Sequence, residues 1–125
     1  MTIDPGIKLL IVDDLPENLL ALEASIRDDG YSIHEASSGE EALALLLEHE
    51  FALAILDVQM PGMNGFELKR ELSTRYDSLP VIMITARAEP GVEEKAMSSG
   101  ATCFLRKPFG AETLMNCLQR VLKSV

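Results

Sequence analysis

Residues 7–17 read IKLLIVDDLPE, an apolar run that ends at two adjacent carboxylates. The run from Ile7 to Val12 is nearly continuous and lacks the polar alternation of a strand with one face in water. Such a run is typical of a strand buried on both faces, as in a parallel sheet. Apolar residues then recur at helical spacing until the glycine stop at Asp29-Gly30, and they are Leu15, Leu19, Leu22 and Ile26. The segment therefore predicts a buried strand followed by a helix.

The same pattern of a strand followed by a helix recurs along the chain. Further strands are predicted over residues 31–35, 52–56, 81–84 and 102–105. Helices are predicted around residues 40–49, 65–76 and 91–99, and a last helix carries Leu114, Leu118, Val121 and Leu122. Strands that alternate with helices of this length imply right-handed crossovers and helices on both faces of a parallel sheet. We expect an α/β fold with a doubly wound sheet, in a single domain over residues 1–125. Residues 1–6 would be a short extension, and no output domain is expected in this chain.

The helix predicted over residues 91–99 differs from the others. Val92 and Ala96 give it a thin apolar stripe, and most of its remaining surface is polar. An element with little apolar surface to bury is held weakly, and weakly held elements are the ones that move. We expect this helix to be loosely attached to the sheet.

Composition restricts the classes of partner. The chain has 125 residues and a formal net charge of −9, with 47% hydrophobic residues and no Trp. This balance suits a folded domain and argues against direct nucleic-acid binding, which needs a basic patch. The first six residues lack the features of a signal peptide, and no apolar run approaches the length of a membrane span. We expect a cytoplasmic protein without a membrane partner, for which a cation is the more natural ligand.

The cysteines and histidines give no catalytic pattern. Cys103 and Cys117 fall in a strand-like and a helix-like apolar run, without CxxC spacing or a nearby histidine pair. Because a free cysteine usually behaves as a small hydrophobic residue, we expect two buried free thiols rather than a disulfide or a metal site. His34 and His49 are isolated in the sequence, and we expect neither of them to be catalytic.

Charged residues stand where three of the predicted strands end. Asp13 and Asp14 follow the first strand, Asp57 follows the third, and Lys107 follows the fifth. An open parallel sheet gathers the carboxyl ends of its strands at one edge, where ligands bind. Adjacent carboxylates repel one another unless a cation compensates, and hard oxygen ligands favour Mg²⁺ or Mn²⁺. The sequence therefore predicts a metal site, although Asp14 with Glu17 also fits a helix-capping box.

Residues near these charges indicate phosphate chemistry. The turn dipeptides Pro61-Gly62 and Asn64-Gly65 give the chain after Asp57 a specified shape, which suits a backbone carbonyl as a metal ligand. Asp57 itself is either a nucleophile or a solvated loop carboxylate. Thr85 ends the fourth strand, so that its hydroxyl either donates to a phosphoryl oxygen or closes the strand. Lys107 either neutralises a phosphoryl oxygen or is simply solvated.

Taken together, these residues resemble the receiver domain of two-component response regulators. The resemblance rests on four segments: Asp13-Asp14, DVQMPGMNG at residues 57–65, Thr85-Ala86, and KPF at residues 107–109. It covers nearly the whole chain, in order and at the usual spacings of the family. It implies a flavodoxin-like (βα)5 fold with strand order 2-1-3-4-5. The partners it implies are a sensor histidine kinase or a histidine phosphotransfer protein, and a downstream protein or output domain.

The resemblance also implies a role for each matching residue. Asp57 would accept a phosphoryl group from a phosphohistidine and form an acyl phosphate. Lys107 and Thr85, with the metal, would stabilise the charge of an in-line displacement. The implied metal is Mg²⁺, with Mn²⁺ as the alternative. Its implied ligands, with Asp13 acting through water, are Asp13, Asp14, Asp57 and the backbone carbonyl of Gln59.

Further positions bear on how such a domain signals. Phe104 stands where the family places a switch aromatic, and is otherwise an ordinary core residue. In the switch interpretation, Thr85 moves toward the phosphoryl group and Phe104 turns inward, which reshapes the surface of the fourth helix, fifth strand and fifth helix. The family's Lys–Pro bond, here Lys107-Pro108, is typically cis. Gln59 and Arg87 occupy positions that, in the family, tune acyl-phosphate hydrolysis, and Arg87 would either shield the phosphoryl group or be solvated.

Three other functions stay open at this stage. A receiver-like domain can signal without phosphorylation. A metal-dependent phosphatase with an aspartyl-phosphate intermediate would need a second Asp two residues after the nucleophile, and Gln59 stands there. A flavin or nucleotide binder would use a glycine-rich loop after the first strand, where this chain has Asp13-Asp14. We expect a phosphoacceptor that is not an enzyme beyond its own phosphorylation and slow acyl-phosphate hydrolysis.

Overall fold

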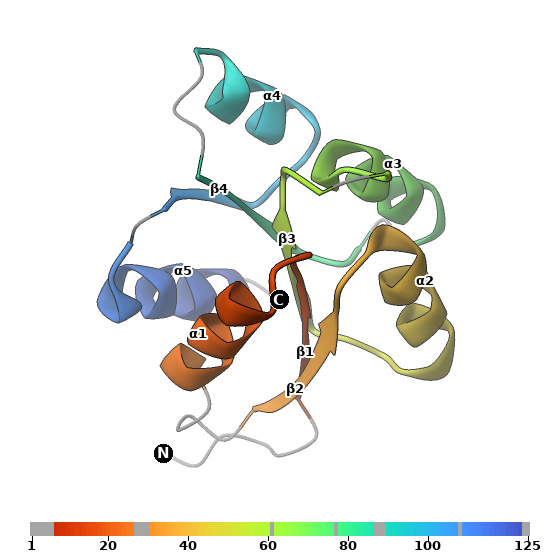
Figure 1. Cartoon of the computed structure of the whole chain (residues 1–125), viewed down its shortest axis with the longest axis horizontal. Helices are drawn as coiled ribbons and strands as arrows, with labels where there is room; N and C mark the ends of the chain where they lie inside the picture. The colour runs from red at the N-terminus through yellow and green to blue at the C-terminus, as the bar shows by residue number, and fades with distance from the viewer. Residues whose placement is uncertain are drawn as a thin grey trace.

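Five parallel strands form a single sheet in the order β2-β1-β3-β4-β5 (Figure 1). The computed structural model describes residues 7–26, 31–60, 62–76, 78–86, 90–107 and 109–123. Within these residues the strands are β1 (Lys8–Val12), β2 (Ser32–Ala36), β3 (Leu53–Asp57), β4 (Val81–Thr85) and β5 (Cys103–Arg106). The expected α/β class and the expected strand order are both confirmed.

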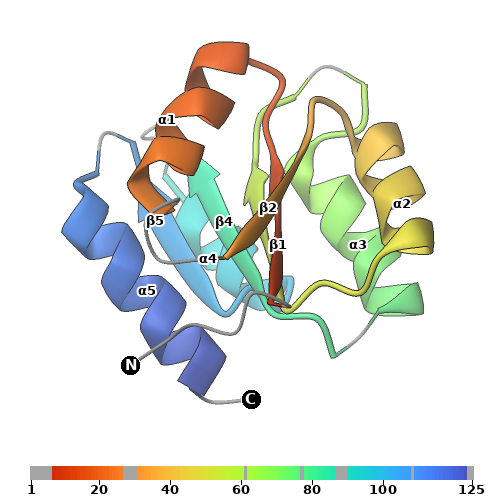
Figure 2. The same ribbon diagram turned by 90° about the horizontal axis from the view of Figure 1, so that it is seen from below.

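Helices cover both faces of this sheet. They are α1 (Pro16–Ile26), α2 (Gly39–Glu48), α3 (Gly65–Arg75), α4 (Val92–Ser98) and α5 (Ala111–Lys123). Figure 2 shows α1 and α5 on one side of the sheet, and α2 and α3 on the other. The helix α4 joins the second group, because Ala96 packs into the same apolar cluster. The sheet is therefore doubly wound, as the alternation of strands and helices predicted. No helix in the described part of the chain is long and apolar enough to span a membrane.

The sheet separates the apolar side chains into two clusters. In β1, Leu9 and Ile11 belong to the cluster that includes α1 and α5, whereas Leu10 and Val12 belong to the cluster of α2 and α3. Every residue of β3 and β4 is buried. Full burial of one large aliphatic side chain contributes about 1.5–3 kcal/mol. The unbroken apolar runs in the sequence reflect this burial on both faces. Each run ends where its strand ends, and the charged residues come at that point.

The helix α4 is short and buries little. It has seven residues, of which Ala96 is buried. The ammonium group of Lys95 lies 4.4 Å from the centre of the Phe66 ring on α3. Gly91, before the first turn, has a φ of +85° and forms no side-chain cap. This small buried surface agrees with the expected weak attachment, and the motion of α4 stays a prediction.

A disulfide joins Cys103 in β5 to Cys117 in α5. The prediction of two free thiols was therefore wrong, although both side chains are buried as expected. The reason is tertiary: Cys103 and Cys117 lie in the same apolar cluster, with their Cα atoms 6.6 Å apart, a separation that a disulfide can span. A sequence separation of 14 residues, without any motif, carried no signal of this pairing.

Candidate functional site

The carboxyl ends of four neighbouring strands bring the predicted site residues to one edge of the sheet. Asp57 and Thr85 are the last residues of β3 and β4, Asp13 directly follows β1, and Lys107 directly follows β5. Backbone hydrogen bonds continue the parallel pairing into this edge. The Lys107 N–H donates to the Thr85 carbonyl at 2.8 Å, and the Asp13 N–H donates to the Ala36 carbonyl at 3.1 Å. The positions of these side chains are therefore set by strand pairing.

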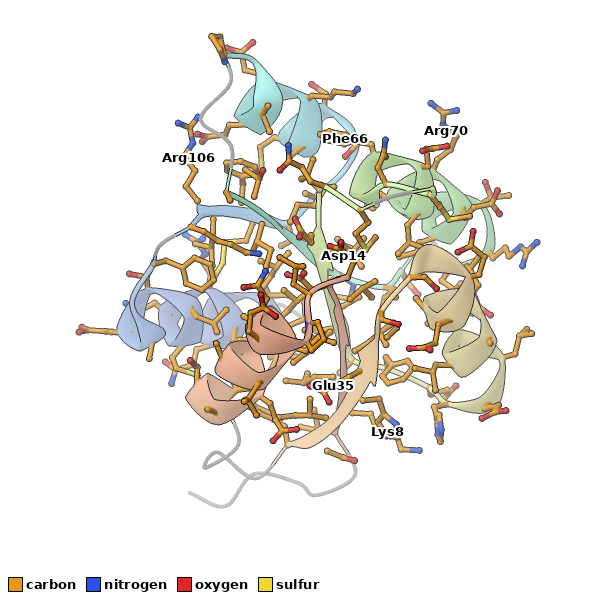
Figure 3. The ribbon with its side chains drawn as sticks, viewed as in Figure 1. Lys8, Asp14, Glu35, Phe66, Arg70 and Arg106 are labelled. Carbon is orange, nitrogen blue, oxygen red and sulfur yellow. A yellow bond between two sulfur atoms is a disulfide. The ribbon has the colours of Figure 1, made fainter. Side chains whose placement is uncertain are left out.

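Three carboxylates form an acidic cluster at this edge. One oxygen from each of Asp13, Asp14 and Asp57 lies within 4.8 Å of the others. Asp13 is fully buried, Asp57 is 5% exposed, and Asp14 is partly exposed. Figure 3 labels Asp14 near the centre of the view, where the chain leaves β1. Like charges this close need a compensating cation, and an all-oxygen ligand set suits a hard divalent ion.

Lys107 supplies positive charge to the cluster. Its ammonium group donates to Asp13 Oδ2 at 2.9 Å and lies 3.6 Å from Asp57 Oδ2. The lysine side chain is 19% exposed, so this ion pair is largely shielded from water. A buried pair of this kind is costly to break, because loss of either partner leaves a charge without compensation. Lys107 is thus held within reach of the outer oxygen of Asp57.

Local hydrogen bonds fix the other oxygens of the two buried carboxylates. Asp13 Oδ1 accepts from the Leu15 N–H at 3.0 Å and from the Asn18 amide at 3.3 Å. Asp57 Oδ1 accepts from the Gln59 N–H at 3.0 Å. Each carboxylate therefore has one oxygen bound to the loop that follows its strand and one oxygen that faces Lys107. This division leaves Asp57 Oδ2 as the oxygen directed at the centre of the site.

The alternative role of Asp14 as a helix cap does not fit the structure. The helix α1 begins at Pro16, so the residue directly before it is Leu15 rather than Asp14. A capping side chain belongs to the residue that immediately precedes the first helical residue. Asp14 is placed instead with the other two carboxylates of the acidic cluster.

Burial changes the acidity of Asp57. Its carboxyl pKa is raised to about 6, chiefly because burial disfavours the ionised form. The Gln59 N–H and the charge of Lys107 oppose the rise, whereas the nearby Asp13 adds to it. A divalent cation bound in the cluster would lower this pKa and favour the carboxylate. The site thus holds a buried carboxylate whose charge is incompletely compensated by the protein alone.

The loop after Asp57 is shaped by the start of α3. Asn64 caps this helix: its side chain accepts from the Glu67 N–H, and the Glu67 side chain accepts from the Asn64 N–H. A Cβ atom at Gly65 would lie 2.5 Å from the Asp57 carbonyl oxygen and 2.8 Å from Val58 Cα. Asn64-Gly65 is therefore a helix start packed against the Asp57 backbone, and α3 begins at Gly65 as predicted. Sequence reasoning missed this close approach, for which the glycine was the available signal.

A groove of about 650 Å³ opens beside the acidic cluster. It lies between the loop after β3 and the start of α4, and Gln59, Thr85 and Lys95 are among its lining residues.

Phe104 points to the opposite side of β5 from Cys103 and packs, half-buried, against the cluster of α2 and α3. The described residues do not include Arg87, for which a shielding role was expected. They also do not include Pro108, whose bond to Lys107 was expected to be cis.

Comparison with known proteins gives consistent matches. The family model described as "Response regulator receiver domain" matches residues 9–119. The "Sensor protein EvgS" of Escherichia coli (strain K12) is 36% identical over 121 residues, which cover 97% of this chain and 10% of that protein. The "Response regulator MprA" of Mycobacterium sp. (strain KMS) is 33% identical over 117 residues, which cover 94% of this chain and 51% of that protein. The chain thus spans between a tenth and about half of these curated relatives.

Two solved structures show the same likeness over nearly the whole of their own chains. The chemotaxis protein CheY4 of Vibrio cholerae has a TM-score of 0.86 and 37% identity, and the match covers 93% of this chain and 98% of that one. A CheY-like receiver domain protein from Methanospirillum hungatei has a TM-score of 0.88 and 26% identity, with 94% of each chain covered.

Proposed function

Because this chain belongs to the response regulator receiver domain family, we propose that it accepts a phosphoryl group on Asp57. The donor would be a phosphohistidine on a sensor histidine kinase or a histidine phosphotransfer protein. A chain of this family is a signalling domain of two-component systems, homologous to receiver domains of sensor kinases and to response regulators. Beyond family membership, the proposal names Asp57 as the phosphoacceptor, a phosphohistidine as the donor, and the chemistry of the transfer.

One observation carries the proposal: the ends of three strands bring Asp13, Asp57 and Lys107 into contact. Lys107 Nζ lies 2.9 Å from Asp13 Oδ2 and 3.6 Å from Asp57 Oδ2. In the transfer, Asp57 Oδ2 forms a bond to phosphorus while the bond from phosphorus to the histidine nitrogen breaks. Lys107 is within reach of an oxygen of the arriving phosphoryl group and would stabilise its charge. Such positioned charge supplies most of the catalysis in phosphoryl transfer.

The acidic cluster fits a Mg²⁺ ion, with Mn²⁺ as the alternative. Asp14, Asp57 and the Gln59 backbone carbonyl would hold the ion directly, and Asp13 would hold it through water. The three carboxylates supply hard oxygen ligands within 4.8 Å of one another, and one of them, Asp14, is partly exposed. When bound, the ion would neutralise charge on the carboxylates and the phosphoryl oxygens.

Thr85 and Phe104 would carry the signal to the surface. Thr85 lies at the end of β4, and its hydroxyl would donate to the phosphoryl group. Phe104 lies on the neighbouring strand, where its register partner is Met83 of β4. Movement of both residues would reshape the face formed by α4, β5 and α5, to which a downstream protein or output domain would bind. Because α4 buries little surface, moving it would cost little free energy.

The test is the intact mass of the protein after incubation with acetyl phosphate, with and without Mg²⁺. We expect the wild type to gain one phosphoryl group with Mg²⁺, and Asp57→Asn to gain none. Glu48→Gln, at the exposed end of α2, is the matched control and should behave as the wild type.

Two results would contradict the proposal. One is a phosphoryl group retained by Asp57→Asn, which would move the acceptor elsewhere. The other is a wild type that stays unmodified both with acetyl phosphate and with a phosphorylated histidine phosphotransfer protein, which would favour a receiver that signals without phosphorylation. Rapid multiple turnover on a phosphomonoester would instead indicate a phosphatase.

A further inference from the structure

The disulfide between Cys103 and Cys117 lies beside a surface groove. The two sulfurs connect β5 to α5, which run side by side in Figure 2. Both cysteines line a groove of about 350 Å³, together with Phe104, Asn116 and Arg120. The two cysteine residues are almost fully buried, at 5% and 3% exposure, so the groove is the side from which a small reagent can approach them.

The two sulfur atoms differ in their surroundings. Arg120 Nη2 donates to Cys103 Sγ at 3.0 Å. A guanidinium group at this distance carries a positive charge that stabilises a thiolate more than a thiol, and it therefore favours Cys103 as the departing thiolate when the disulfide opens. The sulfur that leaves as the better stabilised thiolate is the better leaving group in thiol–disulfide exchange. The geometry therefore favours Cys103 as the leaving sulfur and Cys117 as the sulfur that is attacked.

We propose that Cys103–Cys117 is a reversible redox site at the β5–α5 edge, opened by small dithiols with Arg120 stabilising the departing Cys103 thiolate. In the first step, a reductant thiolate bonds to Cys117 Sγ while the bond between the protein sulfurs breaks, and Cys103 keeps the electron pair. In the second step, the second thiol of the reductant loses its proton and attacks the first reductant sulfur, which is bonded to Cys117 in the mixed disulfide. The bond between that sulfur and Cys117 Sγ breaks, and Cys117 leaves as a thiolate. The protein gains two electrons and two protons, and the dithiol becomes a cyclic disulfide.

The site is connected to the phosphoacceptor site through the chain. The covalent ring closed by the disulfide includes Phe104 and Lys107. Lys107 is the residue that contacts Asp13 and Asp57. Opening the ring removes one constraint on the segment that holds Lys107 in place, so we expect slower phosphorylation in the reduced state. This consequence rests on the proposed function, whereas the exchange chemistry does not.

The first experiment counts thiols by alkylation and intact mass on the purified protein, unfolded before alkylation. Without reductant, we expect no alkylated cysteine; after dithiothreitol, we expect two. Exposure of the reduced protein to oxidised glutathione should return it to the unalkylated form. Two free thiols in protein prepared without reductant, and still two after oxidised glutathione, would overturn the proposal.

The second experiment tests the role of Arg120 by the rate of reduction in excess dithiothreitol. Arg120→Met should slow the reduction roughly three- to tenfold, because the leaving thiolate loses its counter-charge. Arg120→Lys keeps the charge and should stay within about twofold of the wild type. Arg70→Met, on the exposed surface of α3 in Figure 3, is the matched control. Equal rates in all four proteins would overturn the role assigned to Arg120.

A trapping experiment identifies the attacked sulfur. Reduced glutathione, which has a single thiol, should leave its mixed disulfide mainly on Cys117, as read by peptide mapping. A mixed disulfide found mainly on Cys103 would reverse the assignment of the leaving group. The rate of reduction and the position of the mixed disulfide can both be measured on Asp57→Asn, so these two measurements are independent of phosphorylation at that residue.

The coupling is tested by the rate of Mg²⁺-dependent phosphorylation of the oxidised and reduced protein. We expect the reduced wild type to be slower by at least about twofold, because Lys107 is less well positioned. A Cys103→Ser/Cys117→Ser variant should show the slow rate under both conditions. Equal rates for the oxidised and reduced wild type would overturn the coupling, and a phosphorylation defect common to both forms would instead count against the proposed function.

Discussion

At the scale of single residues, the chemistry depends on how Asp57 is buried. A carboxylate in this position is unfavourable for folding, because it loses water and lies near Asp13. The Gln59 N–H and Lys107 offset this cost only in part, since the pKa of Asp57 is still raised to about 6. The protein thus keeps a buried carboxylate at the expense of stability, as functional sites commonly do.

Replacement of Asp57 by Asn should therefore stabilise the protein when no divalent cation is present. The folded pKa of Asp57 lies above the unfolded value of 3.8, so its contribution is favourable below pH 3.8 and is lost as the pH rises through about 6. At neutral pH we expect Asp57→Asn to raise the free energy of unfolding by about 1–2 kcal/mol. Urea unfolding in the presence of a chelator measures this. A less stable Asp57→Asn would show that the surroundings favour the charged form.

At the scale of elements, two contacts shape segments that carry candidate site residues, and neither lies within a single helix or strand. The start of α3 packs on the backbone of Asp57 and Val58, which only a glycine at position 65 permits. The segment between β5 and α5 is closed by the disulfide. The existence and approximate limits of the strands and helices were predicted from periodicity, including the thin apolar stripe of α4. The close approach and the disulfide were not, because periodicity describes one element at a time.

Gly65→Ala should damage the site through packing. The new Cβ would lie 2.5 Å from the Asp57 carbonyl oxygen, so α3 or the Asp57 loop must shift. We expect a loss of about 1–3 kcal/mol in the free energy of unfolding, the range for overpacking, together with slower phosphorylation. Gly110→Ala is the matched control: it has open space around the added carbon and should change stability by less than about 0.5 kcal/mol. Equal stability of the two variants, measured by thermal unfolding, would refute this account.

At the scale of the whole molecule, the two edges of the sheet hold different charged groups. The carboxyl edge has the acidic cluster. Toward the opposite edge, the rings of His34 and His49 lie 4.4 Å apart, and Lys8 donates to His49 Nδ1 at 3.1 Å. Burial lowers the pKa of His34, and the charges of His49 and Lys8 lower it further. The two histidines, isolated in the sequence, are thus neighbours in the fold. His34 lies in β2, which pairs with β1, and His49 directly follows the end of α2.

The two edges should affect the pH dependence of stability in opposite directions. His34 has a folded pKa below its unfolded value of 6.5, so the unfolded state binds the proton more readily and stability falls as the pH drops below about 6.5. Asp57 acts in the opposite sense over the range from about 6 to 3.8. We expect His34→Gln to lose less stability than the wild type between pH 7 and 5.5, as measured by urea unfolding at each pH. A steeper loss in His34→Gln would mean that protonated His34 is favoured in the fold.

The sequence by itself determined the architecture and which residues gather at the candidate site. Continuous apolar runs require strands buried on both faces, and parallel pairing of such strands brings their carboxyl ends to one edge. The gathering of Asp13, Asp57, Thr85 and Lys107 there follows from that topology. Only the tertiary structure decided which of them touch, that Cys103 meets Cys117, and that Gly65 must be small. The reason is physical: strand and helix patterns describe one element at a time, whereas these contacts join residues of different elements and loops and depend on how the elements pack.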